Sequence, residues 1–83
     1  MNSVIVIQDN TAKTATLEVS NISIETKRED LIELFREYGK CHVRKSYYST
    51  NAYVEFREAK DAQEAVSKLN GYRFEGSVLK VKE

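Results

Sequence analysis

The sequence contains no proline and no tryptophan, and its one cysteine, Cys41, has no second cysteine with which to form an intramolecular disulfide. A lone thiol is typical of proteins from a reducing compartment, so we expect an intracellular location. One histidine and one cysteine also give no clustered ligand spacing for a structural zinc site. The longest apolar run, residues 4–7, is far shorter than a membrane span or the apolar core of a signal peptide. The sequence therefore predicts no metal, no membrane insertion and no secretion.

No charge of either sign prevails, because 13 Lys and Arg residues balance 13 Asp and Glu residues. A strongly basic chain would indicate nucleic-acid binding by its net charge, and this chain does not. Any evidence for RNA must therefore come from where the charges lie. The 83 residues, 41% hydrophobic and 31% charged, suffice for one small globular domain.

Apolar residues recur with the period of a strand in four segments and with the period of a helix in two. Thr26 and Glu29 fit a capping box at the start of the first helix, and Gly39 supplies its end. Asn70-Gly71 ends the second helix, and Glu75-Gly76 forms a turn into the last strand. The predicted strands are residues 16–20, 41–48, 52–56 and 78–82, and the predicted helices are residues 26–38 and 60–69.

The order βαββαβ predicts an α+β fold of the ferredoxin-like type, in which two helices cover one face of a four-stranded antiparallel sheet. We assign this domain to residues 15–83. Residues 1–14 form an N-terminal extension, in which Val4 to Ile7 could be an extra strand. The opposite face of the sheet stays open to water or a ligand, and we expect it to carry Glu18, Ser20, His42, Arg44, Asn51, Tyr53, Glu55, Lys80 and Lys82.

Several segments resemble the signature motifs of RNA-recognition-motif domains. Residues 16–22 resemble the first-strand motif of that family, and residues 49–56 resemble its third-strand octamer; the short connection before the octamer resembles the first domains of SR-type splicing factors. The resemblance covers residues 15–83 and implies a domain that binds single-stranded RNA across its sheet. It further implies a role in mRNA processing, such as splicing, and a nuclear or nucleocytoplasmic location. Further matching landmarks are residues 31–39, 61–66, 69–71 and 76–81.

The signature motifs are degenerate at the positions that contact RNA. The family stacks bases on aromatic rings of the two central strands. Of the three usual ring positions, Tyr53 is aromatic, whereas Glu18 and Asn51 occupy the other two. Ser49 and Thr50 replace the usual basic residue and glycine at the start of the octamer. Since one stacked base contributes about 1–3 kcal/mol, we predict modest RNA affinity, further lowered by the Glu18 carboxylate.

Three tyrosines and one carboxylate are the main candidates for contact with RNA. We interpret Tyr53 as a base-stacking ring in preference to a strand tyrosine that only packs on its neighbours. Tyr47 and Tyr48 end the second predicted strand; since neighbouring side chains point to opposite faces, we expect one of them to pack inward. Glu18 could accept hydrogen bonds from base amino groups, but we favour a cross-strand ion pair with Arg44 or a lysine.

The basic residues cluster on the two predicted edge strands, while residues 25–37 hold five acidic residues against three basic ones. Two interpretations stay open: the edge cations hold phosphates, or they only solvate the strands and block aggregation. Of these cations, at most Lys45 is expected to face the helices. We expect Cys41 to be a small core residue. The predicted RNA-contacting residues are Tyr53, Asn51, Glu18, Ser20, His42, Arg44, Tyr47, Tyr48, Lys80 and Lys82.

The alternative hypothesis is a protein-interaction module on the same fold, docking through the helical face or through the strand at Val4 to Ile7. Family members that bind peptides through the helical face usually carry Arg-x-Phe after the second helix. Here Phe74 is kept but Tyr72 stands in place of the arginine, which argues against that variant. A protein partner or a second domain of a longer chain is therefore still open. Since no catalytic arrangement stands out, we predict no enzymatic activity and no cofactor.

Overall fold

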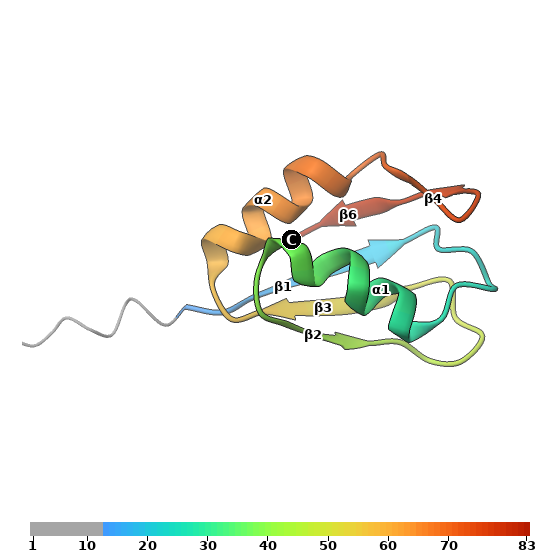
Figure 1. Ribbon diagram of the computed structural model, residues 1–83, viewed down its shortest axis with the longest axis horizontal. Coiled ribbons are helices and arrows are strands. Elements are labelled where there is room, and N and C mark those ends of the chain that lie inside the picture. The colour runs from blue at the N-terminus through green and yellow to red at the C-terminus, as the bar shows by residue number, and fades with distance from the viewer. Residues whose placement is uncertain (1–12) are drawn as a thin grey trace, which may run out of the picture.

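A computed structural model describes residues 13–83, and Figure 1 shows a sheet with both helices on one of its faces. The main sheet has the strand order β2-β3-β1-β6, with antiparallel neighbours throughout. The predicted fold is confirmed for these residues, whereas the predicted strand at Val4 to Ile7 lies outside them. The elements are β1 (Ala15–Ser20), α1 (Arg28–Phe35), the 3-10 helix η2 (Arg36–Tyr38), β2 (Cys41–Arg44), β3 (Ala52–Phe56), α2 (Ala59–Leu69), β4 (Arg73–Phe74), β5 (Ser77–Val78) and β6 (Lys80–Lys82).

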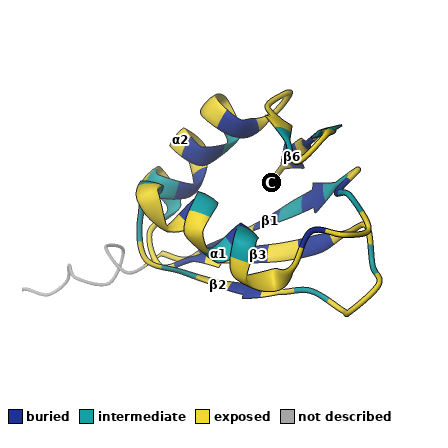
Figure 2. Cartoon of the chain, turned by 45° about the vertical axis from the view of Figure 1, so that its right-hand side comes forward, coloured by how far each residue is buried: buried dark blue, intermediate teal, exposed yellow. Residues whose placement is uncertain are grey.

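The core lies between the sheet and the two helices. Alternate residues of the central strands are buried, as the bands along β1 and β3 in Figure 2 show. Phe35 of α1 packs edge-on against Phe56 of β3, with 6.3 Å between the ring centroids. Burial of a large apolar side chain stabilises the fold by about 1.5–3 kcal/mol, so the apolar face of the sheet packs stably against the helices. The most deeply buried large side chains are Phe35, Phe56, Leu17, Leu31, Leu69, Leu79, Val19, Val43 and Val54.

The second strand is shorter than predicted, because it ends at Arg44 and residues 45–50 form a turn. The Ser49 N–H donates to the Ser46 carbonyl at 3.2 Å and closes this turn. The Lys45 ammonium donates to the carbonyls of Ser46 and Tyr47 at 3.1 and 3.4 Å. These local bonds satisfy carbonyls that a longer strand would pair with β3. The prediction of a strand running to Tyr48 is wrong.

The first helix also begins differently from the prediction. Thr26 is buried, and its hydroxyl donates to a Glu75 carboxylate oxygen at 2.7 Å, which ties the start of the helix to the turn after β4. The helix begins at Arg28, and the Lys27 N–H donates to the Asp30 carboxylate at 3.0 Å. The predicted capping box between Thr26 and Glu29 is wrong, because the Thr26 hydroxyl serves a tertiary contact.

The predicted last strand is divided into two parts. Glu75 and Gly76, both with positive φ angles of 51° and 88°, turn the chain between β4 and β5, which form a separate two-stranded hairpin. Leu79 is buried after this hairpin, and β6 then joins the main sheet beside β1. Lys80 and Lys82 still point to the open face, so the predicted alternation is confirmed.

Cys41 is half-buried at the start of β2 and packs against the core, as expected. Burial raises the pKa of the Cys41 thiol, because a thiolate would lose solvation there. The thiol is therefore kept in its neutral form. Neither helix among residues 13–83 has the length and apolar composition needed to cross a membrane.

Candidate nucleic-acid interface

Four residues form a single row across the open face of the sheet. Arg44 of β2 lies opposite Tyr53 of β3, Tyr53 lies opposite Glu18 of β1, and Glu18 lies opposite Lys82 of β6. Directly opposed side chains in antiparallel strands lie about 4.5–5.5 Å apart at their Cβ atoms, so each contacts the next. The row therefore brings together one residue from each strand of the sheet, all of them predicted from the sequence as RNA-contacting residues.

Tyr53 is the aromatic residue of this row, and its side chain is open to a ligand. The residue is 47% exposed although it lies in the second position of a central strand. The Arg44 guanidinium carbon lies 5.9 Å from the centre of the ring, within the range of a cation–π contact. The contact places a positive charge beside a flat apolar surface, which is the combination that a base and its phosphate require.

Glu18 pairs with Lys82, whose ammonium nitrogen lies 3.9 Å from a Glu18 carboxylate oxygen. The side chains are 75% exposed for Lys82 and 45% exposed for Glu18. Exposed pairs of this kind contribute little to stability, roughly 0–1 kcal/mol. The Glu18 carboxylate offsets the charge of Lys82 next to the Tyr53 ring. The predicted cross-strand ion pair is thus present, with a lysine as its partner.

The other predicted residues surround this row. His42 lies opposite Glu55, and Ser20 lies opposite Lys80. Among residues 13–83, the structure pairs neither the Arg44 nor the Lys80 side chain with a carboxylate. Asn51 is exposed just before β3, and its backbone N–H and carbonyl both bond to the Ser49 hydroxyl at 3.0 Å. The amide side chain of Asn51 therefore stays available to a ligand.

A polar groove of about 620 Å³, which we call the basic groove, runs along the β2 edge beside Tyr53. Its side chains bear positive charges and hydroxyl or amide groups, with no acidic residue among them. Such a lining fits a phosphate backbone. Its charged and aromatic members are Arg28, His42, Arg44, Lys45 and Tyr53, and its neutral members are Val43, Ser46, Ser49 and Asn51.

Tyr47 and Tyr48 both lie at the surface, with exposed fractions of 79% and 74%. The prediction that one of them packs inward is wrong, because the strand has already ended and the alternation of a strand no longer applies. The two rings contact each other instead, with centroids 4.8 Å apart and planes inclined at 66°. Two large apolar side chains are thus exposed together near the basic groove.

Arg28 belongs to this interface but was not predicted from the sequence. It lies in the first turn of α1, where a cation opposes the helix dipole. Its Nε–H donates to the Val43 carbonyl of β2 at 2.8 Å, so the guanidinium lies at the edge of the sheet. The one signal in the sequence was the unfavourable placement of a cation at the start of a helix.

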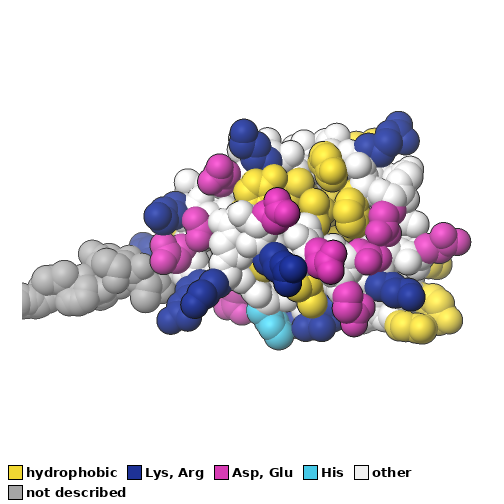
Figure 3. Space-filling model, viewed as in Figure 1, with side chains coloured by type: hydrophobic (Ala, Val, Ile, Leu, Met, Phe, Trp, Pro, Cys, Tyr) yellow, Lys and Arg dark blue, Asp and Glu magenta, His cyan; other side chains and the backbone are white. Residues whose placement is uncertain are grey.

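The helical face carries many acidic side chains around an apolar area, as Figure 3 shows from the side of the helices. The exposed outer residues of α1 include Glu29 and Glu33. The positive charge of Arg28 is directed away from them, because its side chain extends to the sheet edge. Partly buried Ile32, Leu34 and Val66 pack against the core on this side. Residues 25–37 hold five acidic and three basic residues, and Arg28, one of the three, extends to the sheet edge.

Similarities to known proteins point in the same direction as the geometry. The sequence model of the "RNA recognition motif" family matches residues 17–80, inside the predicted domain of residues 15–83. A "Sxl-lethal protein/RNA complex" has a chain of the same fold, with a TM-score of 0.77 and 30% identity over 84% of this chain and 46% of that chain.

Two curated relatives share about a third of their matched residues with this chain. A component of eukaryotic translation initiation factor 3 from Nematostella vectensis is 33% identical over 76 residues, which are 83% of this chain and 26% of that protein. "Regulator of rDNA transcription protein 5" of Candida glabrata is 30% identical over 77% of this chain and 17% of that protein. The chain thus spans about a quarter or less of the length of these relatives.

Proposed function

The chain belongs to the RNA recognition motif family, and on this premise we propose that it binds single-stranded RNA across the open face of its sheet. In this proposal Tyr53 stacks on a base, while Arg44 and Lys80 contact phosphates. The observation that carries it is the row in which Arg44 lies against the exposed Tyr53 ring. The role is one of binding, not of catalysis.

The affinity of this surface is modest in our proposal. Two of the three usual stacking positions hold Glu18 and Asn51, which have no ring. At about 1–3 kcal/mol for each stacked base, the missing rings lower the affinity by roughly one to four orders of magnitude relative to a complete surface. A second domain of a longer protein would compensate through effective concentration.

We place the domain in RNA processing or mRNA metabolism, with a nuclear or nucleocytoplasmic location. The relatives named for translation initiation and for rDNA transcription support a role in RNA metabolism in general more than a role in splicing. These relatives are about four or more times as long as the segment that matches this chain, so their roles are those of much longer proteins.

Titration with short single-stranded RNAs, followed by amide and aromatic NMR shifts, tests the proposal. We expect shifts at Tyr53, Arg44 and Lys80, and an affinity that falls with salt by about 0.7 log units per log unit for each phosphate contact. All-A, all-U and all-C oligomers at two salt concentrations would reveal base preference. Shifts confined to the helices, or no shifts with any oligomer, would reject RNA binding by the sheet.

A protein partner is the second candidate function. The acidic helical face with Ile32, Leu34 and Val66 at its surface favours a partner segment that is basic and apolar. A docked segment would bury these side chains and leave the open face unchanged. Pull-down with the wild-type chain and with a Glu29→Lys/Glu33→Lys variant tests it: loss of the partner in the variant is expected, and an equal yield would exclude this face.

A further inference from the structure

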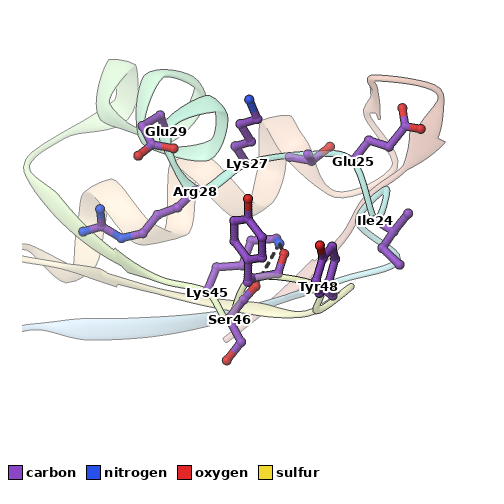
Figure 4. A pocket seen from close by; sticks show the side chains of 10 residues that line it. Ile24, Glu25, Lys27, Arg28, Glu29, Lys45, Ser46 and Tyr48 are labelled. Atoms are coloured by element: carbon purple, nitrogen blue, oxygen red, sulfur yellow. Dashed lines mark hydrogen bonds between the residues drawn. The ribbon is translucent and has the colours of Figure 1, made fainter.

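A second, more apolar cavity of about 690 Å³ lies beside the basic groove, between the loop before α1 and the turn after β2. We call it the loop pocket. It lies off the sheet, and Figure 4 shows Ile24 and Tyr48 toward one end of it and Arg28 extending from the other. Its volume falls within the range of about 300–1,000 Å³ that is typical of small-ligand sites.

The walls of the loop pocket offer flat and apolar surfaces. Ile24 is 57% exposed in its loop, and it lines the pocket together with Tyr47 and Tyr48. The edge-to-face packing of the two tyrosines holds the rings against each other, so that ring faces outside their mutual contact stay open. A planar aromatic group that enters the pocket would stack on one tyrosine ring, whose orientation is already held by the contact with the other tyrosine.

Local hydrogen bonds preorganise this part of the molecule. The Lys45 ammonium bonds to the carbonyls of Ser46 and Tyr47 and holds the turn that carries both tyrosines, as the dashed line at Lys45 in Figure 4 illustrates. The Nε–H of Arg28 bonds to the Val43 carbonyl at 2.8 Å. Since that bond uses one donor of the guanidinium, its terminal amino groups are free for an anion.

The loop pocket adjoins the basic groove. Arg28, Lys45 and Ser46 line both cavities, and Tyr53 lines the basic groove at its other side. A strand that stacks on Tyr53 can therefore leave the sheet over β2 and enter the loop pocket while cations accompany its backbone. No acidic residue lines the basic groove, so the ionic side chains along this path are basic only.

We propose that the loop pocket binds a nucleobase of the same RNA strand, stacked on Tyr47 or Tyr48, with Arg28 contacting the phosphate that connects it to the sheet-bound nucleotides. This inference rests on the proposed function and extends its binding surface beyond the sheet. The pocket supplies an aromatic ring outside the sheet. On the sheet itself, two of the three usual ring positions hold residues without a ring. The strand leaves the sheet on the β2 side, away from Glu18.

RNA fits this pocket better than a peptide for two reasons. A neutral or basic peptide would gain nothing from the cations of the basic groove, whereas an RNA strand carries a phosphate at each nucleotide and requires their neutralisation there. The acidic residues at the pocket, Glu25 and Glu29, have carboxylates that point away from the Tyr48 ring in Figure 4. Lys27 adds a further cation on the side of α1.

The test uses the full 83-residue chain and single-stranded RNA tetramers and octamers of A, C and U. Anisotropy measures affinity, and side-chain NMR spectra follow the Tyr47, Tyr48 and Tyr53 rings. We expect the octamer to shift the Tyr47 or Tyr48 resonances in addition to those of Tyr53. The variant Tyr47→Ala/Tyr48→Ala should weaken octamer binding by about five-fold or more, the lower bound for one stacked base, and leave tetramer binding unchanged.

Two control variants separate stacking from other effects. Tyr47→Phe/Tyr48→Phe keeps both rings and should bind the octamer as the wild type does. Tyr72→Ala removes an exposed tyrosine that lines neither cavity, and it should leave the affinity unchanged. Amide spectra of each variant verify that the fold is kept.

The outcomes distinguish the two proposals. Shifts of the Tyr53 ring without any shift of Tyr47 or Tyr48 in the octamer complex would overturn the pocket and leave binding by the sheet in place. Shifts of Tyr47 or Tyr48 without Tyr53 would overturn binding by the sheet, and with it the proposed path of one strand from the sheet into the pocket. No shift of any of the three rings would overturn both.

Discussion

The two halves of the open face differ in charge and in shape, although they belong to one sheet. On the β2 side, Tyr53 and Arg44 adjoin a groove whose lining has no acidic residue. On the β6 side, Lys82 is paired with Glu18, and no aromatic ring is present among the residues of β1 and β6. A ligand that needs both stacking and positive charge therefore finds them together on the β2 side only.

The number of cations on a face is therefore not enough to locate a binding surface. The open face carries basic residues on both edge strands, but one of them is offset by a carboxylate 3.9 Å away. The row from Arg44 through Tyr53 and Glu18 to Lys82 is thus polarised from one edge to the other.

Replacing Glu18 by phenylalanine should make the β6 half resemble the β2 half. The variant gains a ring at a usual stacking position and loses a carboxylate that repels phosphate. We expect RNA affinity to increase by about 1–3 kcal/mol, as measured by anisotropy. Glu18→Gln is the matched control, which removes the charge without adding a ring and should give a smaller increase. A folded Glu18→Phe variant with unchanged affinity would contradict the role of this row.

Replacing Tyr53 by alanine should remove the ring from the β2 half. We expect a loss of about 1–3 kcal/mol in RNA affinity, whereas Tyr53→Phe should retain most of the binding. Isothermal titration with an RNA octamer measures both. Equal binding by the wild type and Tyr53→Ala would show that the base does not stack there.

The two edge cations of the row should differ in their salt dependence. Arg44→Gln is expected to lower the slope of log affinity against log salt by about 0.7, since one phosphate contact is lost. Lys82→Gln should change the slope less, because Glu18 already offsets the lysine. A larger effect for Lys82 than for Arg44 would reverse the proposed polarity of the face.

The smallest effect concerns stability. Lys82→Gln should change the free energy of unfolding by less than about 1 kcal/mol, because both partners of the ion pair are exposed. Chemical denaturation monitored by circular dichroism measures this change. A loss well above that value would mean that the pair stabilises the sheet and is more than a local charge balance.

Much of the fold was predictable because alternation along a strand depends only on neighbouring residues. Ala52, Val54 and Phe56 are buried and Tyr53 is exposed, as the period of two residues predicted. The same rule failed after Arg44, because hydrogen bonds of Lys45 and Ser49 close a turn that no periodicity reveals. The prediction for Tyr47 and Tyr48 failed with it.

Two other contacts between distant segments could not be predicted, because nothing in the local sequence shows which segments meet after folding. Thr26 has the residue type of a helix cap, yet its hydroxyl bonds to Glu75, 49 residues further along the chain. Arg28 stands out in the sequence only as a cation at the start of a helix, and it is the packing of α1 beside β2 that brings its side chain to the Val43 carbonyl. Both cases depend on segments that meet only after folding.

The sequence by itself determined the order of the two α-helices and of the four strands of the main sheet, the two faces of that sheet and the identity of its exposed residues, because these follow from local periodicity. The tertiary structure alone decided which of these residues are neighbours. Strand register places Arg44, Tyr53, Glu18 and Lys82 in one row. It is also the packing of loops from different parts of the chain that forms the loop pocket next to the basic groove.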